Sequence, residues 1–296
     1  DEISLRNYIL CKYQYAPVWY QQNTKAYFER FNYWGQIDLA AENTEYFDMK
    51  AHDIIKGLDK INWLYHRLKD YSSKALLYAI LENWVNCNTE VLKSTVDTRF
   101  RHYFDLDLLP RFRGAVMADL GAYVGDSALD FINTYGVKAY RKIYCYEITE
   151  PIFCKLQSNL MPYRNIDCRL KAAGAEAGTV GISPNPTDAS SNCTGIGDTV
   201  ERVTLDDDIK EKISIIKMDI EGDEPNALIG AKNHITNDKP VLLISVYHRN
   251  SHLWELPAMI AEFNPNYNYY LRNYGGTVYP TEIVLIAIPK KHKIKK

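Results

Sequence analysis

The segment 116–127, Val-Met-Ala-Asp-Leu-Gly-Ala-Tyr-Val-Gly-Asp-Ser, has the residue types of a ligand-binding turn. It predicts an apolar strand that ends near Asp119, a tight turn that contains Gly121 and Gly125, and the polar start of a helix. Open α/β folds bind ligands beyond the carboxyl ends of their strands, at turns of this kind. A dinucleotide site needs the spacing G-x-G-x-x-G, because its second glycine lets the backbone approach a pyrophosphate. The bulky Tyr123 argues against a pyrophosphate, and Asp119 suits a ligand that carries an amino group.

A carboxylate closes the second predicted strand, residues 142–147. Glu147 is at the position where a carboxylate typically accepts hydrogen bonds from the ribose hydroxyls of a nucleoside ligand. The alternative is a surface residue that, together with Glu150, complements the dipole of the next helix. In combination with the glycine turn, the ribose role is favoured.

Two further carboxylates close a buried apolar strand in the segment 217–224, Lys-Met-Asp-Ile-Glu-Gly-Asp-Glu. Asp219 and Glu221 are two residues apart, so alternation puts both side chains on one side of the strand. They lie at the edge of the sheet where ligands bind, and such a pair can orient a substrate, accept a proton or hold a divalent cation. Helix N-capping explains Asp223 and Glu224, but it explains the first two carboxylates poorly.

A histidine, His248, follows a fourth strand, and the expected strand order puts it beside Asp219. A neutral imidazole that faces two carboxylates can act as a general base near neutral pH. A lone histidine is also commonly structural or solvated. Trp254 and Glu255, just inside the next predicted helix, either wall the pocket or, in the case of the tryptophan, belong to the core.

The elements that must position these groups fall into two regimes. In the first third of the chain, apolar residues recur at helical steps in two stripes, 54–68 and 76–85, with Ser72 and Ser73 as the cap of the second helix. From residue 114 onward, strands and helices alternate, which predicts a mostly parallel sheet with crossover helices.

The boundaries of the alternating elements follow from their apolar runs. Strands are predicted at 115–120, 142–147, 166–172, 213–219, 240–247, 267–272 and 282–288. Helices are predicted at 125–135, 151–160, 224–235 and 251–263. The turn-rich residues 273–276 favour an antiparallel hairpin at the C-terminal edge. We therefore expect an α/β, Rossmann-like fold, with an α-helical N-terminal region at 1–102 and the sheet domain at 103–296.

Composition limits the class of protein. The 296 residues are 46% hydrophobic and 24% charged, which is ordinary for a globular protein. A net charge of −2 provides no global field that favours nucleic acid. The basic run 290–296 predicts a solvated tail, and 183–192 predicts an exposed loop. Six scattered cysteines without a C-x-x-C pair indicate a reduced, cytoplasmic protein. No apolar run approaches the roughly 20 residues that cross a bilayer, and no signal peptide is recognisable.

The chain has 23 tyrosines and five tryptophans, which allow two interpretations. Aromatic faces can stack on sugar rings, whereas tyrosine can equally fill the boundary between core and surface. An early aromatic cluster is a platform that binds a substrate such as a sugar, a homo-oligomer surface or a docking face toward another domain. Its members are Tyr13, Tyr15, Trp19, Tyr20, Tyr27, Phe28, Tyr33 and Trp34.

Several of these motifs occur together, in order, in one known family. They are the segments 119–127, 146–147, 205–206, 217–222 and 245–248. Together they resemble the FkbM-type S-adenosylmethionine-dependent methyltransferases, and the Lys-Met-Asp-Ile-Glu-Gly motif is the most specific part of the likeness. The resemblance covers residues 103–288. Val124 stands where the family often has Asp, a departure that hardly disturbs a site made by the backbone.

The resemblance implies a class I methyltransferase sheet and an O-methyltransferase that acts on a hydroxyl of a sugar, a glycan or a secondary metabolite. His248 is then the expected base, Asp219 orients or replaces it, and Glu221 is a substrate or metal ligand. A divalent cation at Asp219 and Glu221 is left open. The implied S-adenosylmethionine contacts are Asp119, Gly121, Ala122, Tyr123, Gly125, Asp126, Ser127, Glu147, Ala173 and Asp219.

Three alternatives remain from the sequence. The first is a methyltransferase that acts on protein or nucleic acid, although only the tail is strongly basic. The second is a catalytically inactive scaffold that keeps the cofactor fold, and four polar groups at the strand ends argue against it. The third is a nicotinamide-dependent oxidoreductase, which Tyr123 disfavours.

Overall fold

The computed structural model describes residues 1–30, 34–183, 192–193 and 197–290. Most of the predicted exposed loop and of the predicted basic tail therefore lies outside the described residues. The chain divides into two compact units. The first contains Asp1–Asp97, Val246–Ala258 and Tyr269–Leu285, and the second contains Thr98–Ser245, Met259–Asn268 and Ile286–Lys296. The first unit thus includes two segments that are distant in sequence from its helices.

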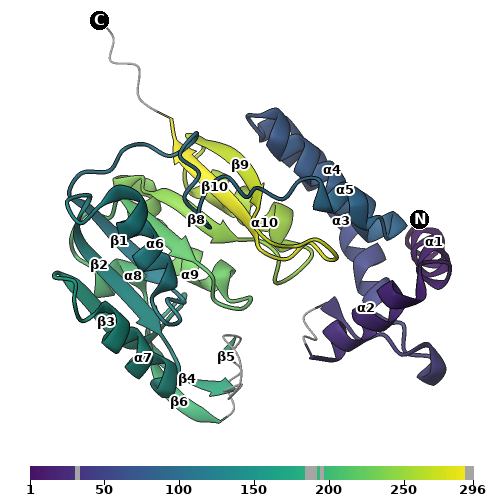
Figure 1. The fold of residues 1–296 in the computed structure, drawn as a ribbon, viewed down its shortest axis with the longest axis horizontal. Coiled ribbons are helices and arrows are strands. Elements are labelled where there is room, and N and C mark those ends of the chain that lie inside the picture. The colour runs from purple at the N-terminus through teal and green to yellow at the C-terminus, as the bar shows by residue number, and fades with distance from the viewer. Residues whose placement is uncertain (31–33, 184–191, 194–196, 291–296) are drawn as a thin grey trace, which may run out of the picture. The chain divides into compact units, whose positions relative to one another are not determined.

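Helices dominate the first unit (Figure 1). They are α1 (Glu2–Gln14), α2 (Val18–Arg30), the 3₁₀ turn Leu39–Ala41, α3 (Glu45–Arg67), α4 (Tyr71–Asn86) and α5 (Thr89–Lys93). The stripe predicted for α3 is largely buried, but Leu58 is 52% exposed. The predicted cap of α4 is wrong, because the helix begins at Tyr71 and the side chain of Asp70 accepts a hydrogen bond from the Ser73 amide. Asp70 also binds Arg272, at 2.7 Å, which fixes it at that position.

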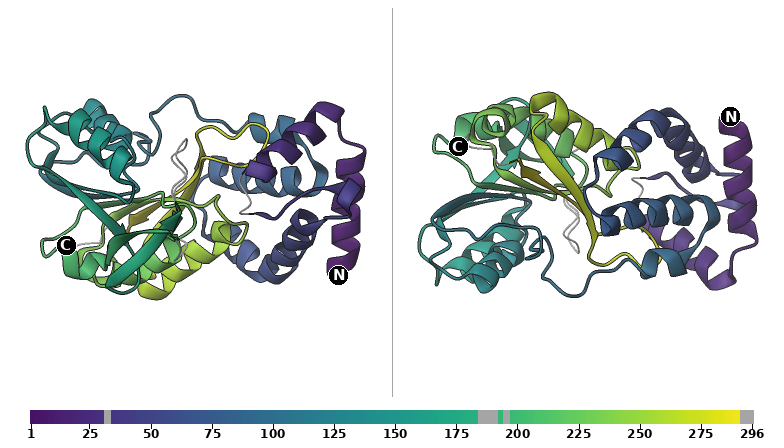
Figure 2. Two further views of the ribbon diagram at one scale, coloured as in Figure 1. Left: turned by 90° about the horizontal axis from the view of Figure 1, so that it is seen from below. Right: turned by 90° about the horizontal axis from the view of Figure 1, so that it is seen from above.

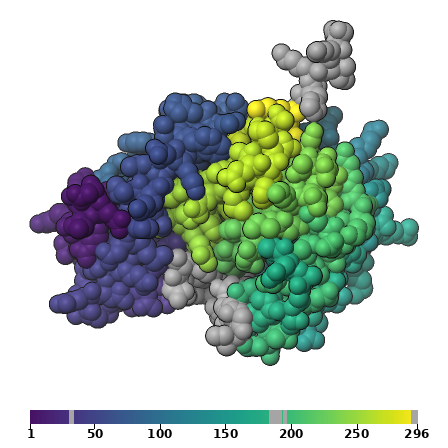
Figure 3. Space-filling view, turned by 180° about the vertical axis from the view of Figure 1, so that it is seen from behind, coloured from purple at the N-terminus to yellow at the C-terminus, as the bar shows by residue number. Residues whose placement is uncertain are grey.

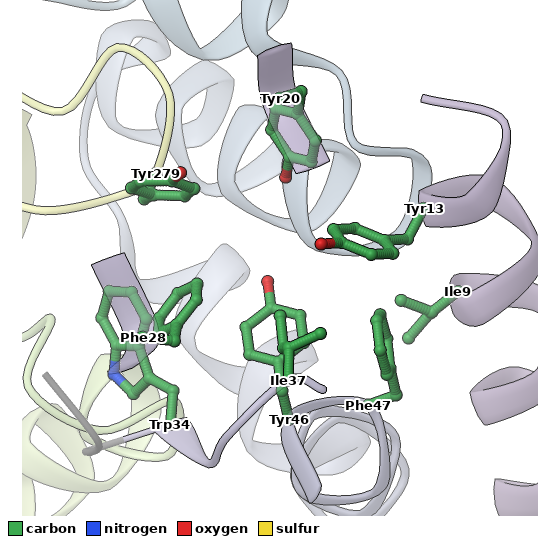
Figure 4. Close-up of a cluster of buried hydrophobic side chains, with 9 residues drawn as sticks. All are labelled: Ile9, Tyr13, Tyr20, Phe28, Trp34, Ile37, Tyr46, Phe47 and Tyr279. Atoms are coloured by element: carbon green, nitrogen blue, oxygen red, sulfur yellow. The ribbon is translucent and has the colours of Figure 1, made fainter. Parts of the chain in front are cut away.

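The aromatic residues of the first unit form much of its core. The buried cluster consists of Ile9, Tyr13, Tyr20, Phe28, Trp34, Ile37, Tyr46, Phe47 and Tyr279. The hydroxyls of Tyr13, Tyr20 and Tyr46 point toward one another inside the cluster (Figure 4). Among the described members of the early aromatic cluster, only Tyr15 and Trp19 are exposed, and Tyr33 lies outside the described residues. Of the seven described members of the early aromatic cluster, four are therefore in the core and Tyr27 packs against it.

The second unit is built on a parallel sheet. Its central strands are β3 (Ile166–Ala173), β2 (Tyr140–Glu147), β1 (Ala115–Leu120), β7 (Ile215–Met218) and β8 (Val241–Ser245), which pair in this order and in parallel. Every residue of β1, β7 and β8 is buried, as expected for strands covered on both faces. The predicted α/β fold with a mostly parallel sheet is confirmed.

Two edges complete the sheet, whose full order is β5-β4-β6-β3-β2-β1-β7-β8-β10-β9. The sequence did not predict β4 (Gly178–Ser183), β5 (Asn192–Cys193) and β6 (Asp198–Val203), of which β4 is antiparallel to both β5 and β6. The other edge is the predicted hairpin of β9 (Tyr267–Asn273) and β10 (Ile283–Pro289). Backbone bonds from Tyr274 to Glu282 and from Lys290 to Asn266, at opposite ends of the pair, have the antiparallel pattern.

Helices cover the sheet on both faces. In the second unit these are α6 (Asp126–Tyr135), α7 (Glu150–Leu160), α8 (Leu205–Asp208), α9 (Glu224–Gly230) and a π-helix, His234–Asp238, while α10 (His252–Phe263) spans the division between the units. Figure 2 shows the teal helices α6 and α7 on one face of the sheet and green helices on the other. Teal and green atoms adjoin at the surface of this unit (Figure 3), as expected where distant segments alternate. No helix of the described segments is long and apolar enough to span a membrane.

Candidate functional site

Three predicted site residues lie at the carboxyl ends of adjacent parallel strands. Glu147 is the last residue of β2, Asp119 is the penultimate residue of β1, and Asp219 directly follows β7. The strand β1 lies between the other two, since Leu120 is in register with both Tyr146 and Met218. The sheet therefore brings these three carboxylates to one edge, where open α/β folds bind ligands.

The glycine turn after β1 is held against both neighbouring strands. The amides of Gly121 and Ala122 donate to the Tyr146 carbonyl of β2, at 3.1 and 2.9 Å. Gly121 has φ +74°, and a Cβ there would lie 1.8 Å from the Asp219 carbonyl oxygen, so only glycine fits. Gly125 also has positive φ, +88°, and a Cβ there would meet the Leu160 side chain. The backbone of Tyr123 also has a positive φ, +47°.

Lys217, on β7, connects the turn to Asp119. Its ammonium is 3.1 Å from Asp119 Oδ1 and donates to the Gly121 carbonyl oxygen at 2.6 Å. The other oxygen of Asp119 accepts a hydrogen bond from Ser127 at 2.5 Å. Burial opposes the charged form of the lysine, but Asp119 and further carboxylates nearby raise the pKa of Lys217 above its ordinary value. The lysine is therefore a buried cation.

Glu147 is buried and its carboxylate is oriented by the backbone. Its Oε1 atom accepts hydrogen bonds from the amides of Ile148 and Thr149, at 2.8 and 2.9 Å. Burial raises the pKa of Glu147 above its ordinary value, and the two amides oppose this shift. The dipole interpretation requires an exposed residue, whereas this carboxylate is 7% exposed.

Asp219 is positioned by a residue from outside the predicted motifs. The hydroxyl of Tyr103 donates to Asp219 Oδ2 at 2.6 Å and lies 3.3 Å from the Ser245 hydroxyl, at the end of β8. The Tyr103 ring stacks on His102, with ring centroids 4.0 Å apart. Burial lowers the pKa of His102 to about 4, so this imidazole is neutral near neutral pH.

The acidic segment after β7 differs in part from its prediction. Asp223 occupies the N-cap position of α9 without a side-chain cap bond. Glu224 is fully buried and accepts hydrogen bonds from the amides of Ile220 and Gly222, at 3.0 and 3.4 Å, so it holds the preceding turn rather than capping the helix. Glu221 lies in that turn with φ +58°, beyond the end of β7, so the strand alternation predicted for Asp219 and Glu221 is wrong.

The remaining predicted residues lie at further strand ends or in the first unit. Ala173 is the last residue of β3, and Asp126 and Ser127 begin α6. His248 is buried and comes three residues after β8, in the part of the chain that belongs to the first unit. Trp254 is buried and packs against Trp84, with ring centroids 6.4 Å apart. Of its two predicted roles, this packing supports the role of a core residue.

Two residues of this edge were not identified as site residues from the sequence. Tyr103 lies in an irregular connector with φ +69°, where no periodicity signals a role. Lys217 stands within the Lys-Met-Asp-Ile-Glu-Gly motif, and a lysine inside an otherwise apolar strand was the available signal.

The chain is similar to known methyltransferases. The family model described as the methyltransferase FkbM domain matches residues 119–275. Among solved structures, a methyltransferase FkbM from Methylobacillus flagellatus KT is 26% identical with a TM-score of 0.68, covering 83% of this chain and 65% of that one. The chain thus spans about two thirds of the length of that protein. No curated protein matches the sequence.

Two further solved structures match at lower identity. An rRNA methylase from Streptococcus thermophilus is 11% identical with a TM-score of 0.42, over 61% of this chain and 90% of that one. Fibrillarin from Aeropyrum pernix, in complex with natively bound S-adenosyl-L-methionine, is 13% identical with a TM-score of 0.38, over 73% and 75%. The family model covers more than half of the sequence, and its start coincides with Asp119. The resemblance seen in the motifs is therefore confirmed, and this chain belongs to the FkbM methyltransferase family.

Proposed function

We propose that this chain is an S-adenosylmethionine-dependent O-methyltransferase whose acceptor is a hydroxyl of a sugar, a glycan or a secondary metabolite. One observation carries the proposal. The buried carboxylate of Glu147 ends the strand next to β1, and the glycine turn after β1 is hydrogen-bonded to that same strand. Both lie within the segment that the family model matches. A carboxylate at the end of the second strand suits a ribose, and the turn without a second glycine suits a ligand that has no pyrophosphate.

The residues at this edge fit the cofactor by their chemistry. Both backbone bonds to Glu147 use Oε1, so neither of them occupies Oε2, the atom that we assign to the ribose hydroxyls. The turn 121–125 would hold the methionine part, and Ala173 would lie near the adenine. Asp119 is fully buried between Lys217 and Ser127, so we assign it to supporting the turn.

Methyl transfer to a hydroxyl has two requirements that the protein must meet, alignment of the acceptor oxygen and removal of its proton. When bound, S-adenosylmethionine supplies a methyl group that its sulfonium already makes electrophilic. The chain must then align an acceptor oxygen with that methyl group, which can contribute roughly 7–11 kcal/mol in ideal cases. It must also remove the hydroxyl proton, and general-base assistance typically adds about 10²–10⁴-fold. We assign the base to His248, with Asp219 as its orienter or substitute and Glu221 as a substrate or metal ligand.

Calorimetry with S-adenosylhomocysteine beside NAD tests the cofactor. We expect binding of the first and none of the second, and the opposite preference would sink the proposal. The acceptor is tested by a methyl-transfer screen against nucleotide sugars, free glycans and lipid-linked glycans, read by mass spectrometry. Running the screen with and without EDTA shows whether a divalent cation takes part. Transfer to protein or RNA in place of these hydroxyl acceptors would overturn the acceptor class.

A further inference from the structure

Lys217 is a buried ammonium at the centre of the strand edge. It is the third residue of β7, and its side chain is 4% exposed. Its ammonium forms an ion pair with Asp119 Oδ1 at 3.1 Å. It donates hydrogen bonds to the Gly121 carbonyl oxygen at 2.6 Å and, at 3.5 Å, to the Leu120 carbonyl oxygen. A lysine is almost never fully buried unless it is paired, so its contacts need an explanation.

The contact with Gly121 clamps the first residue of the turn. On its amide side, Gly121 donates to the Tyr146 carbonyl of β2, and on its carbonyl side it accepts from Lys217 of β7. The residue is thus tied to both strands that flank β1. A charged donor makes a stronger and shorter hydrogen bond than a neutral one, so the orientation of this peptide depends on the lysine.

The contact with Asp119 has a second, separate effect. Asp119 is fully buried, and a buried carboxylate destabilises the fold unless a cation compensates for it. Lys217 therefore neutralises Asp119 and also orients Gly121. Neutralisation alone would make it a stability residue with no influence on ligand binding.

We propose that Lys217 is a positioning residue for the cofactor, which acts through the Gly121 carbonyl by setting the turn that binds the methionine part. This inference rests on the proposed function, since it needs S-adenosylmethionine at the turn. The side chain of Lys217 would thus influence the affinity for the ligand through the backbone of the turn.

The test separates the two effects of the lysine. K217M alone leaves Asp119 buried without its cation, so we expect that variant to lose much of its stability. The double variant K217M/D119N removes the charge of both partners and keeps their size. We expect it to approach the wild-type melting temperature but to bind S-adenosylhomocysteine roughly tenfold or more weakly than D119N alone, because a hydrogen bond to a charged group is lost.

The matched control is K210M, which replaces an exposed lysine of the same unit and should leave the affinity unchanged. A folded K217M/D119N chain that binds S-adenosylhomocysteine as tightly as D119N overturns the positioning role and leaves the proposed function standing. A wild-type chain that does not bind S-adenosylhomocysteine overturns the proposed function itself. Calorimetry gives the affinities, and thermal unfolding monitored by circular dichroism gives the stabilities.

Discussion

Burial changes the protonation behaviour of single residues at the strand edge. Glu147 is buried, and burial raises its pKa, yet a ribose site needs its charged form. E147Q keeps the size of the side chain and removes the charge. We expect it to weaken S-adenosylhomocysteine binding about tenfold or more, because hydrogen bonds to a carboxylate are stronger than those to an amide. Calorimetry at pH 8 measures the difference.

The same residue predicts how the affinity depends on pH. Because the pKa of Glu147 is raised, its carboxylate becomes protonated at a higher pH than an ordinary glutamate. The affinity of the wild type should therefore fall on acidification, and that of E147Q should not show this step. E150Q, which changes an exposed glutamate at the start of α7, is the control and should behave as wild type. Wild-type affinity in E147Q would remove the ribose assignment.

Among the elements, the turn between β1 and α6 is the most constrained by its packing. In G121A, the added Cβ would lie 1.8 Å from the Asp219 carbonyl oxygen, so either the turn or the end of β7 must move. We expect G121A to abolish measurable S-adenosylhomocysteine binding and to destabilise the chain by several kcal/mol, a size typical of overpacking combined with backbone strain.

Gly136 provides a matched comparison for that element. It has φ +83°, close to that of Gly121, and nothing lies within 4 Å of the position of its Cβ. G136A therefore carries only the strain of an alanine at φ +83° and ψ +161°, a region that is almost restricted to glycine, about 1–3 kcal/mol. Denaturant unfolding gives the free energy of unfolding of both variants. The difference between their losses measures the cost of the close approach at Gly121. Equal losses of stability would show that the turn is not pressed against β7.

At the scale of the whole molecule, a buried lysine in the first unit makes stability depend on pH. Lys50 is almost fully buried, donates a hydrogen bond to the Tyr46 hydroxyl and lies over the Tyr46 ring. Burial lowers the pKa of Lys50 to about 7. Between about pH 7 and the ordinary lysine pKa, the unfolded chain binds a proton that the folded chain has released, so stability rises with pH in this window.

The size of this effect follows from the shift. Each pKa unit corresponds to about 1.4 kcal/mol, so the free energy of unfolding should rise by a few kcal/mol between pH 7 and pH 9.5. A partly buried thiol limits the window, since burial raises the pKa of Cys87 above its ordinary value and the unfolded chain loses that proton first. Buried tyrosines limit it further, since the pKa of Tyr13 is raised to about 12. Urea unfolding at several pH values should show the rise in the wild type and in K56M, an exposed-lysine control, but not in K50M. A slope that survives in K50M contradicts the assignment to this lysine.

Local sequence patterns were sufficient for much of the second unit. The continuous apolar runs of β1, β7 and β8 identify strands covered on both faces, and Gly121 and Gly125 mark the turn that follows the first of them. The edge strands β4 and β6 escaped prediction because β4 contains two glycines and β6 is only partly buried, so neither has a clear apolar pattern. The cap of α4 was missed because Asp70 owes its position partly to Arg272, a residue far along the chain.

The sequence by itself determined the fold class, the parallel strands and the carboxylates that end them, because period, composition and glycine placement are local properties of the chain. The tertiary structure alone decided which distant residues meet at that edge of the sheet. Lys217 and the Gly121 carbonyl are 96 residues apart, and Tyr103 and Asp219 are 116 residues apart, yet each pair meets at hydrogen-bond distance. Such contacts depend on the order of strands in the sheet and on where an irregular connector passes, which no local pattern encodes.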